Sequence, residues 1–230
     1  MALTAKQESK FLESSLFVGC EKDSLRGLAQ IVMPHSLFKG EVLRVTREQE
    51  AVGFLLSGKL EICNLHGVLY YNICPGECVG MEDLFSEVAP VVECCVCAKT
   101  NSMLTFLTHQ QMRELLQENR QIRENYLTML ANQVHHSLNR LQQFTAPTPS
   151  IALGMYLLQH ETEGLVRLTD GFAGLARRLN ISRATLYRSM AELEQIQIIS
   201  HFEKTIAVLD VQRLYGYVQS QSDIPSILEG

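Results

Sequence analysis

Residues 110–144 contain neither Gly nor Pro, and this uninterrupted stretch limits what the chain can fold into. Its apolar residues recur at steps of three and four, which predicts a short helix followed by a helix of about seven turns. The apolar positions are Ile122, Tyr126, Leu127, Leu130, Val134, Leu138 and Leu141.

The later apolar positions of this stretch approach heptad spacing, which is typical of a two-chain coiled coil. A helix of this length is also longer than is needed to cover the apolar face of a small β domain. We therefore expect a homodimer whose interface contains Leu127, Leu130, Val134, Leu138 and Leu141. The alternative is that the helix packs on its own β domain.

Short apolar runs separated by glycines occupy residues 37–108 and predict an antiparallel β sandwich or barrel. The glycines are Gly40, Gly53, Gly58, Gly67, Gly76 and Gly80. In the run from Phe54 to Ile62, the first half is apolar throughout, Gly58 bends the chain and the second half alternates apolar with polar residues. Residues 5–32 carry helical spacing before this region.

Residues 145–150 follow the long helix and contain Pro147 and Pro149. Proline does not continue a helix interior, so this segment predicts a short, stiff hinge. A helix at residues 151–160 then opens a separate unit. The expected domains are a sensor at 1–109, a dimerisation helix at 110–144, the hinge at 145–150 and a C-terminal domain at 151–230.

A helix-turn-helix pattern lies in residues 168–195. Thr169 or Asp170 can cap a first helix, and Asn180 tolerates the left-handed conformation of a tight turn. Ile181 fills the corner between the helices, and Ser182 can cap the second helix, Arg183 to about Gln195. The expected inner faces are formed by Leu175, Ala176, Leu179, Leu186, Met190 and Leu193.

The outer face of the second helix carries the residues that a DNA-reading helix requires. These are Arg183, Thr185, Tyr187 and Arg188. An arginine in the first turn of such a helix can pair with guanine O6 and N7, and a preceding helix bearing Arg177 and Arg178 would cross the phosphate backbone.

Two short apolar segments, 196–200 and 204–209, flank the polar tip 201–203 and predict a β-hairpin after the second helix. A hairpin in this place makes a winged helix, whose tip and Lys204 can contact phosphates. The net charge of −5 argues against nucleic acid for the whole chain, but residues 165–215 carry +2 and the remainder −7. The basic charge thus gathers where DNA contact is expected.

Taken together, these motifs resemble the cyclic-AMP receptor protein and FNR (CRP/FNR) family of bacterial transcription regulators. The resemblance spans nearly the whole chain. The motifs are Leu175-Ala176 with Leu179-Asn180, Ser182-Arg183, Thr185 and Arg188 in the C-terminal half, and Lys39-Gly40-Glu41, Leu55 to Leu60, and Pro75-Gly76-Glu77 with Gly80 in the front half.

The resemblance implies an α+β chain with an N-terminal cyclic-nucleotide-binding-type β-roll (jelly roll), a long dimerisation helix and a C-terminal winged helix-turn-helix. It implies a homodimer on a palindromic site in double-stranded DNA. Residue by residue, Arg183 and Arg188 match the family's base-reading and phosphate-contacting arginines, with Ser182 and Thr185 in support. RNA polymerase is a candidate partner, since activation depends on patches that touch it.

Two departures from the family pattern concern specificity. Ala184 stands where the family has an acidic base reader, so the familiar half-site is not expected. The effector pocket would include Gly76, Glu77, Met81, Val92 and Glu93. Met81 replaces the ribose-binding carboxylate, and Val92-Glu93 replace the Arg-Ser pair that holds the cyclic phosphate, so cyclic AMP is not the expected effector.

The effector itself stays open in the sequence. Seven cysteines in a chain without a signal-peptide pattern predict mostly reduced, buried thiols, with a thiol redox switch as the alternative. An FNR-type iron–sulfur cluster does not fit, because Cys20 is the single cysteine before residue 60, and no protein metal site is expected. Some family members bind haem and respond to nitric oxide or carbon monoxide; candidate ligands are His35, His66, Cys74, Cys78, Met81, His135 and His136.

Other function classes fit the sequence less well. A cupin-type metalloenzyme needs two or more converging histidines, and the β region has His66 with His109 just past it. A regulator responding to a cyclic nucleotide or another small metabolite is the alternative reading. With no apolar run long enough for a membrane span and no signal-peptide pattern, we expect a cytoplasmic protein without membrane contact.

Overall fold

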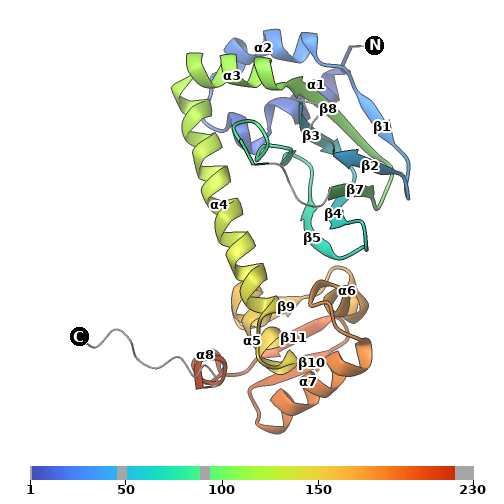
Figure 1. The fold of residues 1–230 in the computed structure, drawn as a ribbon, viewed down its shortest axis with the longest axis vertical. Helices are drawn as coiled ribbons and strands as arrows, with labels where there is room; N and C mark the ends of the chain where they lie inside the picture. Colours follow the sequence, from blue (N-terminus) through green and yellow to red (C-terminus); the bar gives the residue numbers. More distant parts are fainter. Residues whose placement is uncertain (1, 46–50, 89–93, 221–230) are drawn as a thin grey trace, which may run out of the picture. The chain divides into compact units, whose positions relative to one another are not determined.

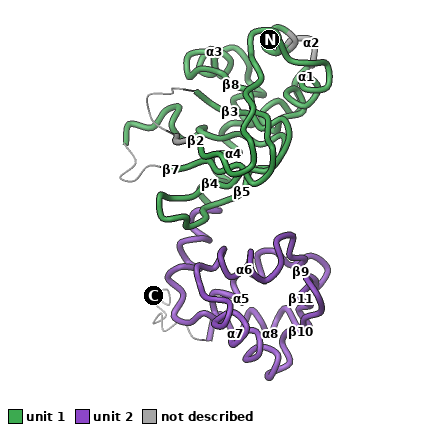
Figure 2. The backbone as a smooth tube through the Cα atoms, turned by 90° about the vertical axis from the view of Figure 1, so that its right-hand side faces the viewer, with its two compact units in different colours: residues 1–135 green, residues 136–230 purple. Residues whose placement is uncertain are grey.

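The computed structural model of the protein describes residues 2–45, 51–88 and 94–220. The chain forms two compact units, residues 1–135 and 136–230 (Figure 2). The helix named α4, Arg120–Phe144, contributes residues to both units. Each unit is described separately below.

The N-terminal unit contains two antiparallel sheets of four strands each (Figure 1). One sheet has the order β1-β8-β3-β6 and is built from His35–Leu37, Ser102–Thr108, Ala51–Ser57 and Cys78–Val79. The other has the order β2-β7-β4-β5 and is built from Val42–Val45, Cys94–Ala98, Leu60–Asn64 and Leu69–Ile73. The elements α1 (Ala5–Leu12), η1 (Ser15–Phe17) and α2 (Lys22–Ile31) precede them.

Strand β3 is buried on both faces and joins the two cores of this unit, as its continuous apolar run predicts. Phe54 packs with Phe11 and Phe17, with ring centroids 5.1 and 5.7 Å away, in the core beneath the helices. Leu55 points into the second core, between the sheets. Gly58 ends the strand at φ +96°, and a side chain there would meet the Ser102 Cα at 2.6 Å, so glycine is required for the bend.

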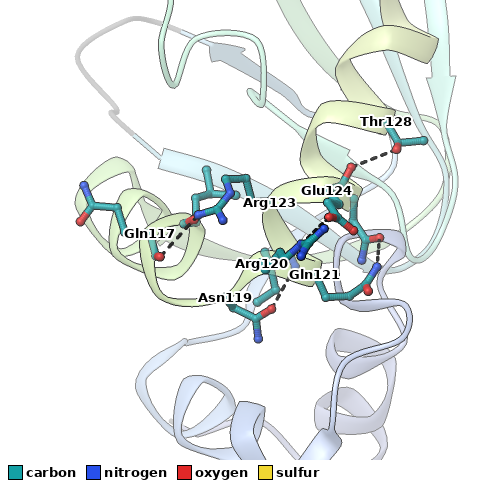
Figure 3. Close-up of polar contacts among 10 residues, drawn as sticks. Gln117, Asn119, Arg120, Gln121, Arg123, Glu124 and Thr128 are labelled. Carbon is teal, nitrogen blue, oxygen red and sulfur yellow. Dashed lines mark hydrogen bonds and ion pairs between the residues drawn. The ribbon is translucent and has the colours of Figure 1, made fainter.

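The long Gly- and Pro-free stretch forms two helices, α3 (His109–Glu118) and α4, as predicted. Figure 3 shows their junction at Asn119. The Asn119 side chain accepts the Ile122 amide at 3.1 Å, and the Arg123 guanidinium donates to the Leu116 carbonyl at 2.9 Å, so backbone groups left open at the break gain partners. Arg120 pairs with Glu124 at 2.7 Å on the exposed side.

The first turns of α4 pack on the N-terminal unit. Ile122 and Tyr126 are buried in its core, and Asn125 donates to the carbonyls of Leu16 and Val18 at 2.9 and 2.8 Å. The alternative that the helix packs on its own β domain therefore applies to this part of α4. The later turns differ and are described with the candidate sites.

The C-terminal unit combines helices with a three-stranded antiparallel sheet of order β10-β11-β9. Its elements are α5 (Pro149–His160), β9 (Leu165–Arg167), α6 (Gly171–Arg178), α7 (Arg183–Gln195), β10 (Ile199–Phe202), β11 (Thr205–Val208) and α8 (Val211–Ser220). This arrangement, a helix-turn-helix followed by a hairpin, is the winged helix that the sequence predicted.

Three details of this unit differ from the prediction. Helix α5 starts at Pro149, because Thr148 caps it at 3.2 Å from the Ile151 amide and proline suits a first helical position. The hairpin tip is Glu203-Lys204, since Phe202 pairs with Thr205. Strand β9 adds a third strand through Val166, which lies opposite Ile206 and was not predicted because its run is short.

None of the helices among the described residues is long and apolar enough to cross a membrane.

Candidate DNA-binding interface and effector cavity

The turn between α6 and α7 has the geometry expected from its residues. Asn180 adopts φ +55°, in the left-handed region that asparagine tolerates. The amide of Ile181 donates to the carbonyl of buried Ala176 at 3.0 Å, which closes the turn against the end of α6. The short Ala176 side chain leaves room for the two helices to approach closely.

Ser182 caps α7, as predicted. Its side chain accepts the Thr185 amide at 3.0 Å, and the two hydroxyls are 2.8 Å apart. The cap satisfies one of the open amides at the start of the helix. The direction of α7 is therefore defined at the end where a recognition helix contacts bases.

We expect Ser182→Ala to lower the free energy of unfolding by about 1 kcal/mol, since the Thr185 amide would lose its acceptor. Urea unfolding of the full chain, followed by circular dichroism, measures the effect. Ser182→Asp should recover most of the loss, because aspartate is an equally good cap. Ser200→Ala, on exposed β10, is the matched control, and an equal effect of both alanine variants would contradict the role of the cap.

The inner face of α7 is anchored in the core of the C-terminal unit. Leu186, Met190 and Leu193 are at most 1% exposed. The opposite face carries Arg183, Tyr187 and Arg188, which are exposed, while Thr185 is half-buried and accepts from the Arg188 guanidinium at 3.4 Å. The structure thus brings the predicted polar side chains together on the outer face of one helix whose other face is fixed.

The two arginines on α6 have different surroundings. Arg177 is exposed, whereas Arg178 is half-buried, with its guanidinium 5.9 Å from the centre of the Tyr156 ring. The Arg178 carbonyl accepts from the Arg140 guanidinium, at the end of α6. Burial, together with the nearby charge of Arg178, lowers the pKa of Arg140 to about 10. The half-buried Arg178 side chain thus packs against Tyr156 within the C-terminal unit.

The wing presents its basic and aromatic side chains to solvent. Lys204 is exposed at the tip and Phe202 is 76% exposed. His201, on β10, contacts Glu194 of α7 through an Nδ1–Oε1 distance of 2.6 Å. These contacts place the wing beside the C-terminal half of α7.

Phe172 was not identified from the sequence, although it connects all parts of this surface. Its ring centroid lies 5.7 Å from that of Tyr187 on α7 and 5.5 Å from that of His201 on the wing. The available signal was its position on the apolar stripe of α6, three and four residues before Leu175 and Ala176, and its ring packs against the same core. Phe172 therefore links α6, α7 and the wing through side-chain contacts that local periodicity does not reveal.

The residues predicted for the effector pocket lie in different environments. Gly76 and Glu77 form a tight turn, in which the Glu77 carboxylate accepts the Cys74 amide at 2.7 Å and the Gly76 carbonyl accepts from Ser14 at 3.0 Å. Met81 is buried. Val92 and Glu93 lie outside the described residues.

Met81 lines a cavity of about 50 Å³ in the N-terminal unit. The lining residues are Tyr71, Cys78, Met81, Glu82, Met129, Leu130 and Gln133. The Tyr71 hydroxyl contacts the Glu82 carboxylate at 3.4 Å. Loss of hydration raises the pKa values of both groups, and the Asp83 carboxylate raises that of Glu82 further.

Haem does not fit the cavity beside Met81. Ligand pockets for larger molecules enclose roughly 300–1,000 Å³, whereas this cavity measures about 50 Å³. Within the described part of the chain, the cavity lining contains no histidine, and no group of three or more His, Cys, Asp or Glu side chains is placed to hold a metal ion. Among the candidate ligands, Cys78 and Met81 reach the cavity; His35 instead packs on Phe106, with ring centroids 5.9 Å apart.

Cys78, at the cavity, is expected to resist alkylation. Burial raises the pKa of its thiol to about 12, against an ordinary value of about 8.5. The thiolate is the reactive form, so at pH 8 the native protein should react at Cys78 about 10³-fold more slowly than the urea-unfolded chain, and the native rate should rise with pH. Peptide mass spectrometry after timed alkylation measures both rates.

The exposed Cys74 serves as the internal control for that measurement, because its accessibility changes little on unfolding. Equal slowing at Cys74 would show a general effect of the native state on the reagent. A native Cys78 that reacts as fast as the unfolded one would contradict the raised pKa of its thiol.

The predicted dimer residues on α4 are mostly exposed in the single chain. Leu127, Val134, Leu138 and Leu141 expose 59%, 58%, 51% and 58% of their surface. Leu130 differs, because it is half-buried, packs against the core of the N-terminal unit and lines the cavity. Leu127, Val134, Leu138 and Leu141 follow heptad steps with Ala131, and these five residues are called the α4 seam below.

No protein-family model and no curated protein matches the chain. Solved structures do. A mutant of CooA from Carboxydothermus hydrogenoformans has a TM-score of 0.69 at 13% identity, covering 85% of this chain and 94% of that one. The c-di-GMP-responsive global regulator CLP of Xanthomonas campestris has a TM-score of 0.59 at 15% identity, covering 83% and 100%.

A transcriptional regulator of the CRP/FNR family from Thermus thermophilus also matches, with a TM-score of 0.52 at 19% identity, covering 81% of this chain and 98% of that one. Structural similarity at 13–19% sequence identity establishes the fold of the chain. The α+β class, the β-roll and the winged helix expected from the sequence are confirmed in one chain and in the expected order. The chain therefore has the fold of the CRP/FNR-type transcription regulators.

Proposed function

We propose that the protein is a sequence-specific DNA-binding transcription regulator of the CRP/FNR type. The observation that carries the proposal is the first half of α7, where exposed Arg183, Tyr187 and Arg188 project from a helix whose inner face is fully buried. A rigid helix with arginines on its outer side is suited to the major groove. The similarity to solved regulators supports the same function.

Each residue of this surface has a proposed role. Arg183 reads a base edge, Arg188 contacts a base or phosphate, and Ser182 and Thr185 support them from the first turn. Tyr187 borders the same surface, and Lys204 contacts phosphate from the wing. For the phosphate contact on α6 we favour exposed Arg177 over Arg178, whose side chain packs against Tyr156.

Ala184 gives this surface a different specificity from that of the acidic family pattern. Alanine has no carboxylate to accept the cytosine N4 amine, whereas its methyl group can contact the methyl of thymine. Ala184 is exposed between Arg183 and Thr185, so it is available for such a contact. We propose a half-site in which the position facing Ala184 is a thymine.

The α4 seam supports a homodimer as the DNA-binding form. Its four large apolar side chains, each more than half exposed, repeat along one helix at coiled-coil spacing. Pairing two copies would bury them, and a two-fold dimer reads a palindromic site.

Selection from random double-stranded DNA with the purified full chain tests this function. We expect enrichment of a palindrome whose half-sites are one helical turn or a multiple of it apart, about 10–10.5 base pairs per turn. Binding should weaken with rising salt, in proportion to the few phosphate contacts. Recovery of unenriched DNA across salt concentrations would contradict the proposal.

The effector is proposed to be other than cyclic AMP. Buried Met81 offers a thioether where a ribose-binding carboxylate would be needed, and the cavity beside it measures about 50 Å³. Titration calorimetry with cyclic AMP is expected to show no binding heat. A saturable isotherm of one nucleotide per chain would contradict this part of the proposal.

A further inference from the structure

Three cysteines share one face of the sheet β2-β7-β4-β5. In the β4–β7 ladder, Cys63 lies opposite Cys95, and Glu61 lies opposite Cys97. Paired residues of an antiparallel ladder point to the same side, and the side alternates along each strand. Cys63, Cys95 and Cys97 therefore point to one side of the sheet, whereas Cys94 points to the other and packs against the core between the sheets.

Two of these thiols are in direct contact. The Sγ atoms of Cys63 and Cys97 are 3.4 Å apart, on neighbouring strands and diagonal to one another. A disulfide requires an S–S distance of about 2.05 Å, about 1.4 Å shorter than this contact, and a Cα–Cα distance below about 7 Å. Diagonal neighbours in an antiparallel ladder are about 7–8 Å apart, so forming the bond also draws the two strands slightly together. Cys63 is buried and Cys97 is half-buried, so a reagent from solvent meets Cys97 first.

We propose that Cys63 and Cys97 are a redox-sensitive dithiol that low-molecular-weight disulfides and hydroperoxides convert reversibly into an intramolecular disulfide. The chain thus carries a modification site in its β-roll, separate from the cavity and from the DNA-binding surface. The site does not rest on the function proposed above, because its chemistry depends on the two thiols alone.

With a small disulfide as oxidant, the Cys97 thiolate attacks one of its sulfurs, forms a mixed disulfide and releases one small thiolate. Cys63 then loses its proton and attacks the Cys97 sulfur, which releases the second thiolate. Two protein thiols are oxidised and one small disulfide is reduced to two thiols. With a hydroperoxide, Cys97 becomes a sulfenic acid and an alcohol or water leaves; Cys63 then displaces water.

The disulfide would close a covalent loop of residues 63–97, and this loop contains four of the residues that line the cavity. Tyr71, Cys78, Met81 and Glu82 all lie between residues 63 and 97. Crosslinking these two strands therefore closes a loop around the cavity-lining segment of the β-roll. A reductant would reopen it.

The test counts thiols in the full chain. Reduced protein is treated with glutathione disulfide or hydrogen peroxide, denatured, alkylated and weighed by mass spectrometry. We expect the Cys63 and Cys97 peptides to lose their alkylation and to appear as one linked pair without glutathione mass, in a chain free of intermolecular disulfides. Dithiothreitol should restore all seven thiols. An unchanged count of seven would overturn the proposal, and so would a loss that dithiothreitol does not reverse.

Three serine variants identify the pair. Cys95→Ser is the matched control, since Cys95 shares the face and lies directly opposite Cys63; it should still lose two thiols. Cys63→Ser should stop at the mixed disulfide and retain the mass of one glutathione on Cys97, while Cys97→Ser should leave Cys63 as an alkylatable thiol. Loss of the disulfide in Cys95→Ser, with its persistence in Cys97→Ser, would assign the bond to Cys63 and Cys95 and overturn the proposal.

Discussion

Arg183→Ala is expected to abolish discrimination between the selected DNA site and random DNA. A bidentate pair between arginine and guanine contributes about 1–3 kcal/mol of discrimination. A symmetric dimer loses two such pairs, so the affinity for the selected site should fall between about 30-fold and 10⁴-fold, taking 1.4 kcal/mol as a factor of ten. Arg183 is exposed on a capped, buried-faced helix, so the substitution should leave the fold intact.

A DNA titration at fixed salt measures this effect on selected and random duplexes in parallel. Arg120→Ala is the matched control, because it removes an equally exposed arginine from α4 within the N-terminal unit. Arg120→Ala should retain full discrimination. If Arg183→Ala weakened binding to both duplexes equally, Arg183 would be a phosphate contact and its role as a base reader would be refuted.

Val134→Asp is expected to convert the proposed dimer into monomers. Val134 is 58% exposed at the centre of the α4 seam, so in a two-fold pair each substitution would face its own copy. Two carboxylates would then lose hydration at a short distance, which costs several kcal/mol, roughly a 10³-fold or greater rise in the dimer dissociation constant. DNA affinity should fall with it, because a monomer reads one half-site.

Sedimentation equilibrium of the full chain measures the change in oligomeric state. Asn132→Asp is the matched control, since it adds the same charge two residues away, on the opposite side of α4, where the side chain is also exposed. It should leave the dimer intact. A Val134→Asp protein that sediments as wild type would count against the α4 seam, and a monomeric wild type would remove the dimer from the proposal.

Much of the proposed DNA-binding surface was predictable because its signals are local. Asn180 in the left-handed turn, Ser182 as a cap and Leu186 on the inner face depend on neighbours within one or two helical turns. The division of this stretch into a short and a long helix and the exposed heptad positions of α4 follow from the same periodicity. These predictions needed no knowledge of what packs against the helices.

Other features depend on contacts between residues far apart in the chain. Leu130 belongs to the heptad pattern, but its side chain packs against the core of the N-terminal unit. Arg178 belongs to the basic face of α6, but its guanidinium packs against the ring of Tyr156 from α5. Strand β9 has too short a run to be detected, and its pairing with β11 creates it.

The sequence by itself determined the order of the β unit, the long helix and the helix-turn-helix with its hairpin, the Ser182 cap and the outward arginines of α7. Dihedral preferences and side-chain periodicity act over a few residues, which is why these features are readable. The tertiary structure alone decided which thiols touch, how small the cavity beside Met81 is and how Phe172 joins α6, α7 and the wing. These depend on strand neighbours and helix crossings, whose contacts join residues that are distant in the sequence.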